Sequence, residues 1–247
     1  PPAPAATGAG PNDSNRTTGT PMHANIVVLP GDGIGPEITV AAVDVLKAIA
    51  ARFGHDFNFA EHDIGGIAID NHGEPLPAAT LDACSKADAG LLGAVGGPKW
   101  SDPNAKVRPE QGLLTIRKAL GLFANLRPVR THPAALHASP IKPELLADVD
   151  FVVVRELTGG IYFGDKTRDA DSASDLCRYT VAEIERVLRS AFNLARQRRR
   201  QLTSVDKANV LETSRLWRRA AARIGREEFP DVELEHQLVD SMAMHLI

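Results

Sequence analysis

A glycine-rich turn between an apolar run and an amphipathic segment limits the fold of this chain more than any other feature. Residues 25–49, NIVVLPGDGIGPEITVAAVDVLKAI, predict a buried strand, a turn, and a helix with Pro36 and Glu37 in its first turn. Four apolar residues form one face of that helix: Ile38, Ala41, Val45 and Ile49. A strand that enters a helix through such a turn is typical of α/β proteins.

The glycines of this turn do not match the dinucleotide-binding fingerprint. Gly31, Gly33 and Gly35 have the spacing G-x-G-x-G, whereas the fingerprint is G-x-G-x-x-G, and no acidic residue clearly ends a second strand at the expected distance. We therefore predict an α/β fold that is not a Rossmann fold. We also expect the backbone of the turn to approach a ligand closely.

The rest of the chain continues the alternation of strands and helices. With 247 residues, of which 43% are apolar, it can hold one large or two modest α/β domains. Apolar patterns predict strands at residues 56–64, 89–97, 150–157 and 232–238, and a helix at residues 112–120. Thr180 and Glu183 form a capping box before another helix. Five residues make up the apolar face of that helix: Ile184, Val187, Leu188, Ala191 and Leu194.

Charge and cysteine content exclude several classes of function. The net charge of -3 gives no general attraction to nucleic acid or to an anionic membrane, and we interpret the basic run at residues 196–200 as a solvated helix end. No apolar stretch is long enough to span a bilayer. Cys84 and Cys177 lack metal-site spacing, which favours a reducing cytoplasm. Residues 1–21 lack the pattern of a secretory signal, and we expect them to be a disordered lead.

Three arginines stand where an apolar or loop residue is the usual choice: Arg117, Arg127 and Arg155. Arginine binds a carboxylate through two parallel hydrogen bonds, so three converging arginines would indicate a substrate with more than one carboxylate. The alternative is three separate surface ion pairs. Arg155 favours the first interpretation, because four apolar residues precede it on a predicted buried strand.

Three further polar residues follow predicted strands or turns: Tyr162, Lys207 and Asp240. A phenol, an amine and a carboxylate could supply an acid, a base and a metal ligand. Each also has a structural alternative, namely a packed tyrosine, a solvated lysine and a helix cap. The same holds for Asp206, which could cap the helix that we expect to carry Val210, Ser214, Trp217, Ala221 and Ile224.

Long motifs resolve this choice, because the chain from Met22 to Ile247 resembles the isocitrate/isopropylmalate dehydrogenase family. The resemblance rests on LPGDGIGPE (29–37), GGPKW (96–100), LLTIRKALGLFANLRPV (113–129), VVRELTGGIYFG (153–164), TSVDKANVLETSRLW (203–217) and VELEHQLVDSMAMHL (232–246). It implies a two-domain α/β fold, which we expect to comprise residues 22–122 and 123–247. It further implies a homodimer with shared active sites.

The resemblance assigns a role to each candidate residue. Tyr162 and Lys207 match the catalytic pair, and Asp240 matches a ligand of Mg²⁺ or Mn²⁺ that also lies near the substrate. Three substrate-binding arginines are implied at Arg117, Arg127 and Arg155. A further set is implied near the NAD cofactor: Gly96, Gly97, Pro98, Lys99, Trp100 and Glu110.

The helix before Arg117 bears on the substrate. Glu110, Leu113 and Leu114 match positions that meet the isopropyl group in isopropylmalate enzymes. Two leucines would leave a third carboxylate unpaired, which disfavours isocitrate. The implied reaction is the NAD-dependent oxidative decarboxylation of 3-isopropylmalate to 4-methyl-2-oxopentanoate in leucine biosynthesis, and a tartrate or homoisocitrate dehydrogenase is the alternative.

The resemblance also implies parts that this sequence does not contain. The family completes its metal site with two more aspartates and has an adenosine-binding loop, both beyond the position of Asp240. We therefore expect a C-terminally truncated chain with an incomplete fold that is inactive by itself. A truncated product without catalytic function is the alternative from another class.

Overall fold

The computed structural model describes residues 20–102 and 104–246, which form two compact units. The first unit ends at Ile116 and the second begins at Arg117, so the division falls within helix α4 (Pro109–Ala119). The expected boundary after residue 122 lies a few residues further along. Most of the expected disordered lead, residues 1–19, lies outside the described residues.

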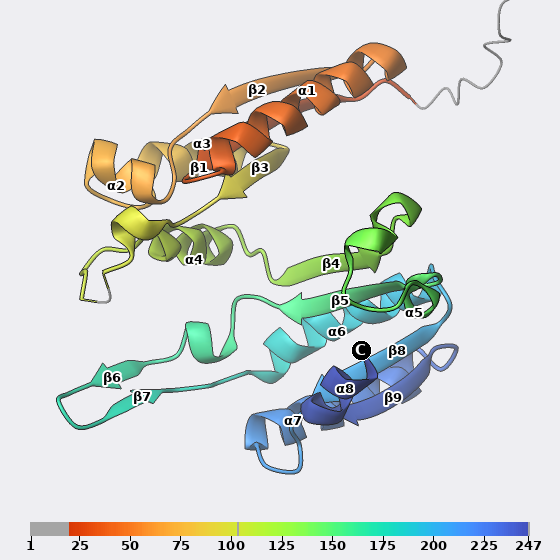
Figure 1. Ribbon diagram of the computed structural model, residues 1–247. Helices are drawn as coiled ribbons and strands as arrows, with labels where there is room; N and C mark the ends of the chain where they lie inside the picture. The colour runs from red at the N-terminus through yellow and green to blue at the C-terminus, as the bar shows by residue number, and fades with distance from the viewer. Residues whose placement is uncertain (1–19, 103, 247) are drawn as a thin grey trace, which may run out of the picture. The chain divides into compact units, whose positions relative to one another are not determined.

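The first unit is a parallel sheet of three strands in the order β2-β1-β3 (Figure 1). Its strands are β1 (His23–Gly31), β2 (Asp56–Glu61) and β3 (Ala89–Ala94). Its helical segments are α1 (Gly35–Phe53), α2 (Gly66–His72), α3 (Ala78–Lys86), η1 (Pro98–Trp100) and most of α4. The central strand β1 is the most buried, with Val27 and Leu29 each 3% exposed. The predicted strand, turn and helix are therefore confirmed, with Pro36 and Glu37 in the first turn of α1.

The apolar face predicted for α1 is not covered by the described residues. Ile38 is 43% exposed, Val45 is 58% exposed and Ile49 is 38% exposed. The buried residues of the helix are Gly35 and Thr39 instead. Helical periodicity locates an apolar face, but a narrow sheet of three strands buries only the side that lies against it.

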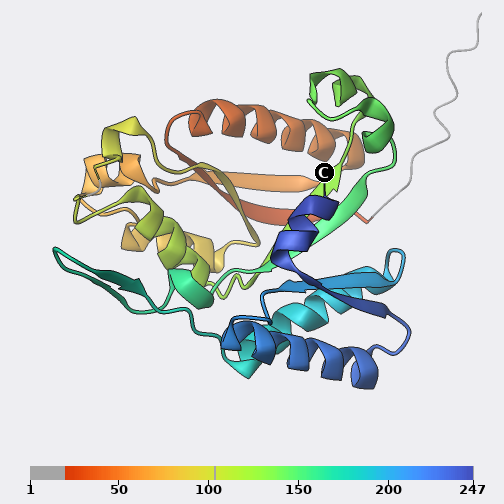
Figure 2. The same cartoon turned by 60° about the horizontal axis from the view of Figure 1, so that its bottom comes forward.

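The second unit is built from paired strands and two long helices. The strands form an antiparallel pair β4-β5, a short hairpin β6-β7 and a parallel pair β8-β9. Their bounds are β4 (Ala124–Arg130), β5 (Asp150–Glu156), β6 (Lys166–Arg168), β7 (Ala173–Asp175), β8 (Gln201–Asp206) and β9 (Glu233–Leu238). The helical segments are η2 (Pro133–Ala138), α5 (Pro143–Leu146), η3 (Gly160–Tyr162), α6 (Val181–Arg196), α7 (Glu212–Glu228) and α8 (Val239–His245). Figure 2 shows α6 and α7 together with β8.

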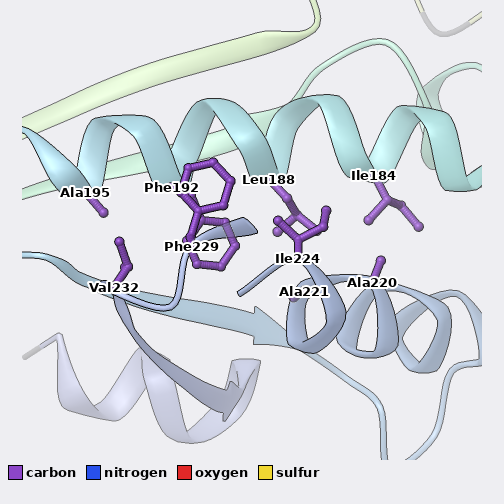
Figure 3. Packing of buried hydrophobic residues seen from close by; sticks show 9 residues of the cluster. All are labelled: Ile184, Leu188, Phe192, Ala195, Ala220, Ala221, Ile224, Phe229 and Val232. Carbon is purple, nitrogen blue, oxygen red and sulfur yellow. The ribbon is translucent and has the colours of Figure 1, made fainter. Parts of the chain in front are cut away.

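The core of this unit lies between α6 and α7 (Figure 3). Ile184 and Leu188 on α6 face Ile224 on α7, and Phe192 stacks on Phe229 with ring centroids 4.8 Å apart. The predicted capping box at the start of α6 is confirmed. Replacing a buried phenylalanine by alanine costs about 3–5 kcal/mol, so this cluster holds the two helices in place.

The basic run after α6 is paired rather than free. Arg196 forms an ion pair with Asp231, and Arg198 and Arg199 both contact Asp150. These guanidinium groups hold the pKa of Asp150 below its ordinary value, chiefly through the hydrogen bond from Arg198. Since two aspartates offset much of the charge, the run is a surface helix end, as interpreted from the sequence.

Candidate functional site

In the first unit, one buried carboxylate fixes the loop that contains residues 96–100. Asp32 is 2% exposed and accepts hydrogen bonds from the backbone N–H groups of Gly66 (2.7 Å), Ile67 (2.8 Å) and Gly96 (2.7 Å). The donors belong to the start of α2 and to the segment that follows β3. Asp32 thus joins three segments that are distant in sequence.

A second, exposed aspartate holds the far end of the same loop. Asp70 accepts a hydrogen bond from Lys99 Nζ (2.5 Å) and a longer one from Trp100 Nε1 (3.3 Å). The bond from Lys99 keeps the pKa of Asp70 below its ordinary value. Glu110 lies over the other end of the loop, because a Cβ at Gly96 would stand 2.9 Å from Glu110 Oε1. The structure therefore brings Glu110 and the 96–100 loop together.

The glycine turn before α1 packs closely against the protein itself, and its expected approach to a ligand stays a prediction. A Cβ at Gly31 would stand 2.0 Å from the carbonyl oxygen of Ala94, and one at Gly35 would stand 2.0 Å from the oxygen of Pro30. Both glycines thus permit close packing of the backbone against β3 and β1. A Cβ at Gly33 would stand 3.8 Å from the carbonyl oxygen of Gly96, an ordinary contact, so Gly31 and Gly35 are the closely packed glycines of the turn.

Helix α4 presents the residues expected to select the substrate. Leu113 and Leu114 are half-buried, whereas Glu110 is exposed. Spacings of three and four residues place them with Arg117 on one side of the helix. The helix predicted at residues 112–120 is confirmed, with bounds at Pro109 and Ala119.

In the second unit, the three candidate arginines lie close enough to repel one another. Burial lowers the pKa of the Arg117 guanidinium, and the positive charges of Arg155 and Arg127 lower it further. Arg127 and Arg155 lie on the same face of the β4-β5 pair, because Arg127 is opposite Val153 and side chains two apart share a face. Among the described residues, no carboxylate forms an ion pair with any of the three. An unbalanced group of guanidinium ions is an anion site.

Arg155 differs from its prediction in one respect. The strand β5 is half-buried rather than buried, and Arg155 lies on its exposed face beside the 43% exposed Val153. Its guanidinium carbon lies 5.2 Å from the ring centroid of Tyr162, which is 54% exposed. An open cleft of about 370 Å³ is lined by both residues together with Tyr179 and Trp217. Arg155 and Tyr162 are thus brought together.

Lys207 and Asp240 form a second pair. Lys207 Nζ donates a hydrogen bond of 2.6 Å to Asp240 Oδ1, which keeps the pKa of Asp240 below its ordinary value. Lys207 follows the end of β8, and Asp240 lies in the first turn of α8 after the parallel strand β9. The carboxyl ends of adjacent parallel strands therefore bring the two side chains together.

Asp206 does not cap the following helix. It accepts hydrogen bonds from Ala208 N (2.9 Å) and from Arg218 Nε and Nη2 (2.9 and 2.8 Å). Helix α7 starts at Glu212, and its N-cap residue Leu211 makes no side-chain cap. Val210 lies before the helix and is 61% exposed, so its predicted place on the helix was wrong.

The candidate residues of the second unit thus form two groups. Across the described part of this unit, no hydrogen bond or ion pair joins Lys207 or Asp240 to the arginines. Nor do the described residues contain a cluster of three or more His, Cys, Asp or Glu side chains that could hold a metal ion. Asp240 is therefore a single oxygen ligand, which does not complete a site for Mg²⁺ or Mn²⁺.

Sequence reasoning missed two residues that organise these groups, Asp32 and Glu156, and it interpreted a third, Asp206, only as a helix cap. Each is a buried acid at the end of a strand or in the turn after it. A pair of charged residues after an apolar run, here Arg155 and Glu156 after residues 151–154, is the signal that could have found Glu156, since a buried acid needs hydrogen-bond donors. For Asp32 the donors come from distant segments, and no sequence pattern shows them.

Comparisons with known proteins identify the family of this chain. Residues 25–247 match the family model "Isocitrate/isopropylmalate dehydrogenase". A 3-isopropylmalate dehydrogenase of Rhodopirellula baltica is 57% identical and one of Anaeromyxobacter dehalogenans is 58% identical, each over 92% of this chain. The chain spans 64% and 65% of the length of these relatives.

Solved structures support the fold independently. The crystal structure of isocitrate dehydrogenase from Methylococcus capsulatus is 33% identical, with a TM-score of 0.72, and the match covers 90% of this chain and 62% of that one. In the part of the chain that the structure describes, no helix has both the length and the apolar character needed to cross a membrane. Because the family model matches residues 25–247, most of the chain, the chain belongs to the isocitrate/isopropylmalate dehydrogenase family.

Proposed function

We propose that the protein containing this chain catalyses the oxidative decarboxylation of 3-isopropylmalate to 4-methyl-2-oxopentanoate with NAD. The observation that carries this proposal is the group of three arginines without carboxylate partners in the described residues. It needs an anionic ligand to balance its charge, and the relatives at 57% and 58% identity are named for a dicarboxylic acid.

Binding of the acid follows from this charge. The two carboxylates of the substrate are gripped by Arg117, Arg127 and Arg155, each through charge-assisted hydrogen bonds. The bound acid also removes the mutual repulsion that lowers the pKa of Arg117. Binding of the acid therefore also reduces the repulsion among the three guanidinium groups.

Selection of the isopropyl group is assigned to Leu113 and Leu114. Two half-buried leucines gain apolar contact with a branched alkyl group, at about 0.8 kcal/mol per buried CH₂. A third carboxylate at that position would lose its water without gaining a partner. Tartrate and homoisocitrate are the competing substrates, and their relative kcat/KM values test the assignment.

The first unit fits a nucleotide cofactor. Its 96–100 loop is held by Asp32 and Asp70, and Gly96 leaves backbone beside Glu110 that a side chain would cover. NAD held there would supply the hydride acceptor for oxidation at C2 of the acid. Glu110 and the loop orient the cofactor, and the leucines exclude water from the transfer.

Asp240 is the residue that would hold a divalent cation. An ionised carboxylate suits Mg²⁺ or Mn²⁺, and the lowered pKa of Asp240 keeps it ionised. The described residues supply this one ligand, so we derive no step of the reaction through the metal.

Two side chains handle the protons of the reaction. Lys207 removes the proton of the C2 hydroxyl as the hydride leaves, which produces a β-keto acid. The carboxyl group on C3 then departs as carbon dioxide, and Tyr162 delivers a proton to C3. The net change is 3-isopropylmalate plus NAD⁺ to 4-methyl-2-oxopentanoate, carbon dioxide and NADH.

A homodimer explains why the two groups of residues are separate. Four exposed apolar residues flank Lys207 and Asp240 in the sequence: Val210 (61%), Leu211 (48%), Val239 (50%) and Met244 (76%). A second copy would cover such side chains and receive Lys207 and Asp240 in its own arginine site. Both cysteines are free, which suits the cytoplasm as the location of this dimer.

The proposal is tested by NADH formation from 3-isopropylmalate, NAD and Mg²⁺. The protein at its full expressed length is expected to form NADH, whereas the 247-residue chain alone is expected to form none, because its described residues supply a single carboxylate ligand for the metal. Absence of activity at full length would overturn the proposed function. Activity of the 247-residue chain would overturn the expectation that this part is inactive.

A further inference from the structure

Tyr162 has a largely exposed ring. It is 54% exposed, and the guanidinium carbon of Arg155 lies 5.2 Å from its ring centroid. It belongs to the short 3₁₀ segment η3, which is only three residues long. A proton donor must be held within a fraction of an ångström of its target, so the backbone of this segment has to position the ring.

That backbone is held on one side by Glu156. The side chain of Glu156 is 1% exposed, and its Oε2 accepts hydrogen bonds from Thr158 N (2.9 Å) and Gly159 N (2.7 Å). Its Oε1 accepts from Thr158 Oγ1 (2.9 Å) and from Arg186 Nη2 (2.9 Å). Four donors thus converge on one buried carboxylate.

Tyr179 and Arg178 hold the other side of the loop. Gly160 N donates to the carbonyl oxygen of Arg178 at 2.9 Å, and Gly160 has φ of 73°. A Cβ at Gly160 would stand 2.2 Å from Tyr179 Oη, so the loop lies directly against that ring. Two residues later the chain reaches Tyr162.

Arg186 ties this arrangement to helix α6. Its guanidinium carbon lies 4.9 Å from the ring centroid of Phe123, and its Nη2 also donates to Thr158 Oγ1. Because α6 belongs to the packed core of the second unit, Glu156 is itself held rigidly. A continuous series of contacts thus joins the core to the loop through Arg186 and Glu156.

We propose that Glu156 is a positioning residue that sets the place of the Tyr162 phenol for proton delivery. This inference rests on the proposed function, but the position of the ring can be measured without activity. Glu156 touches neither substrate nor cofactor in this role, and it acts through the backbone of residues 158–160.

The test uses 3-fluorotyrosine in the protein at its full expressed length, with the ¹⁹F resonance of Tyr162 assigned by Tyr162→Phe. Glu156→Ala is expected to shift and broaden this resonance, because all four acceptor contacts are lost. Glu156→Gln keeps one acceptor oxygen for the two backbone N–H groups, so a smaller shift is expected. Glu185→Gln is the matched control, because Glu185 pairs with Arg189 and Arg223 on α6 and α7, away from the loop.

Kinetics provide the second measurement. Loss of an outer partner of this kind lowers activity by about 10–100-fold. We expect kcat of Glu156→Ala to fall by that factor with KM for the acid little changed. NADH formation in a single turnover should stay near the wild-type rate, because oxidation precedes proton delivery. A general loss of structure would lower both rates.

The outcomes separate the two proposals. An unchanged Tyr162 resonance in both Glu156 variants overturns the positioning role, whatever the activity. An equal fall of the single-turnover and steady-state rates also overturns it. If the Glu156 variants shift the Tyr162 resonance but the wild-type protein forms no NADH, the proposed function is overturned. The control of the Tyr162 position by Glu156 then still holds.

Discussion

In each unit a buried carboxylate holds a loop in place, but the two carboxylates do so through different partners. In the first unit Asp32 holds a loop through three backbone N–H groups, which lie 34, 35 and 64 residues away in sequence. In the second unit Glu156 holds a loop through Thr158 and Gly159, its near neighbours, and through Arg186 on α6. One carboxylate joins distant segments, whereas the other shapes a local turn and is balanced by a cation.

This difference predicts how each unit responds when its carboxylate is removed by mutation. Loss of Asp32 leaves three buried or part-buried N–H groups in two segments, the start of α2 and the segment after β3, without an acceptor, so the fold of the unit is affected. Loss of Glu156 frees a local turn whose N–H groups can reach water more easily. The free energy of unfolding should depend more on Asp32, and the position of the Tyr162 side chain more on Glu156.

Each unit also has an exposed pair of a lysine and an aspartate. Lys99 and Asp70 close the 96–100 loop of the first unit, and Lys207 and Asp240 join the ends of β8 and β9 in the second. Both aspartates have a lowered pKa because of the lysine hydrogen bond. The first pair joins α2 to the 96–100 loop, while the second consists of two residues with proposed roles in the reaction.

The largest effect is expected for Asp32→Ala. Each buried donor left without a partner costs about 1–3 kcal/mol, so the free energy of unfolding of the first unit should fall by about 3 kcal/mol or more. Hydrogen exchange of the Gly66, Ile67 and Gly96 amides measures this directly. Asp44→Ala on the exposed side of α1 is the control. Equal losses for Asp32→Ala and Glu156→Ala would remove the contrast between the two carboxylates.

A comparison of two glycines comes next. Gly160→Ala is expected to cost about 3 kcal/mol, because its φ of 73° disfavours a side chain and the new Cβ would meet Tyr179. Gly96→Ala has a φ of 95° but meets the flexible end of Glu110, so about half that cost is expected. Urea unfolding of both variants gives the two values. A larger cost at Gly96 would show that the loop of the first unit is the tighter one.

The assignment of acid and cofactor to different units can be tested with Arg127→Met. Removal of one charge-assisted contact should weaken binding of 3-isopropylmalate by about 10–100-fold and leave NAD binding unchanged. Isothermal titration calorimetry with each ligand separately measures both affinities. The exposed Arg219 on α7 provides a matched Arg→Met control. Equal weakening of both ligands would contradict the assignment.

The smallest effect concerns pH. Replacing Lys99 or Lys207 by methionine should raise the pKa of Asp70 or Asp240, respectively, toward the ordinary 3.8. Since the folded pKa is depressed, each pair stabilises the protein above about pH 3.8, and this contribution is lost as the pH falls through the folded pKa. Carboxyl ¹³C titrations give the values, and added salt should weaken both pairs. An unchanged Asp240 pKa in Lys207→Met would contradict the pairing.

Much of the local structure was predictable because its causes are local. The capping box of Thr180 and Glu183 and the apolar face of α6 depend on residues three or four apart, and both are confirmed. The strand and helix around the glycine turn are confirmed for the same reason. Periodicity also located helix α1, but it could not show that the apolar face of this helix is left exposed by the described residues.

The sequence by itself determined which residue types carry charge and where strands end, and so it nominated the arginines, Tyr162, Lys207 and Asp240. Only the tertiary structure decided that Arg117 lies near Arg127 and Arg155, that Lys207 contacts Asp240, and that Asp32 and Glu156 hold the loops. The physical reason is distance along the chain. A hydrogen bond between residues 33 or 64 positions apart depends on how the strands are ordered and how the loops pack, and no local pattern in the sequence encodes that order.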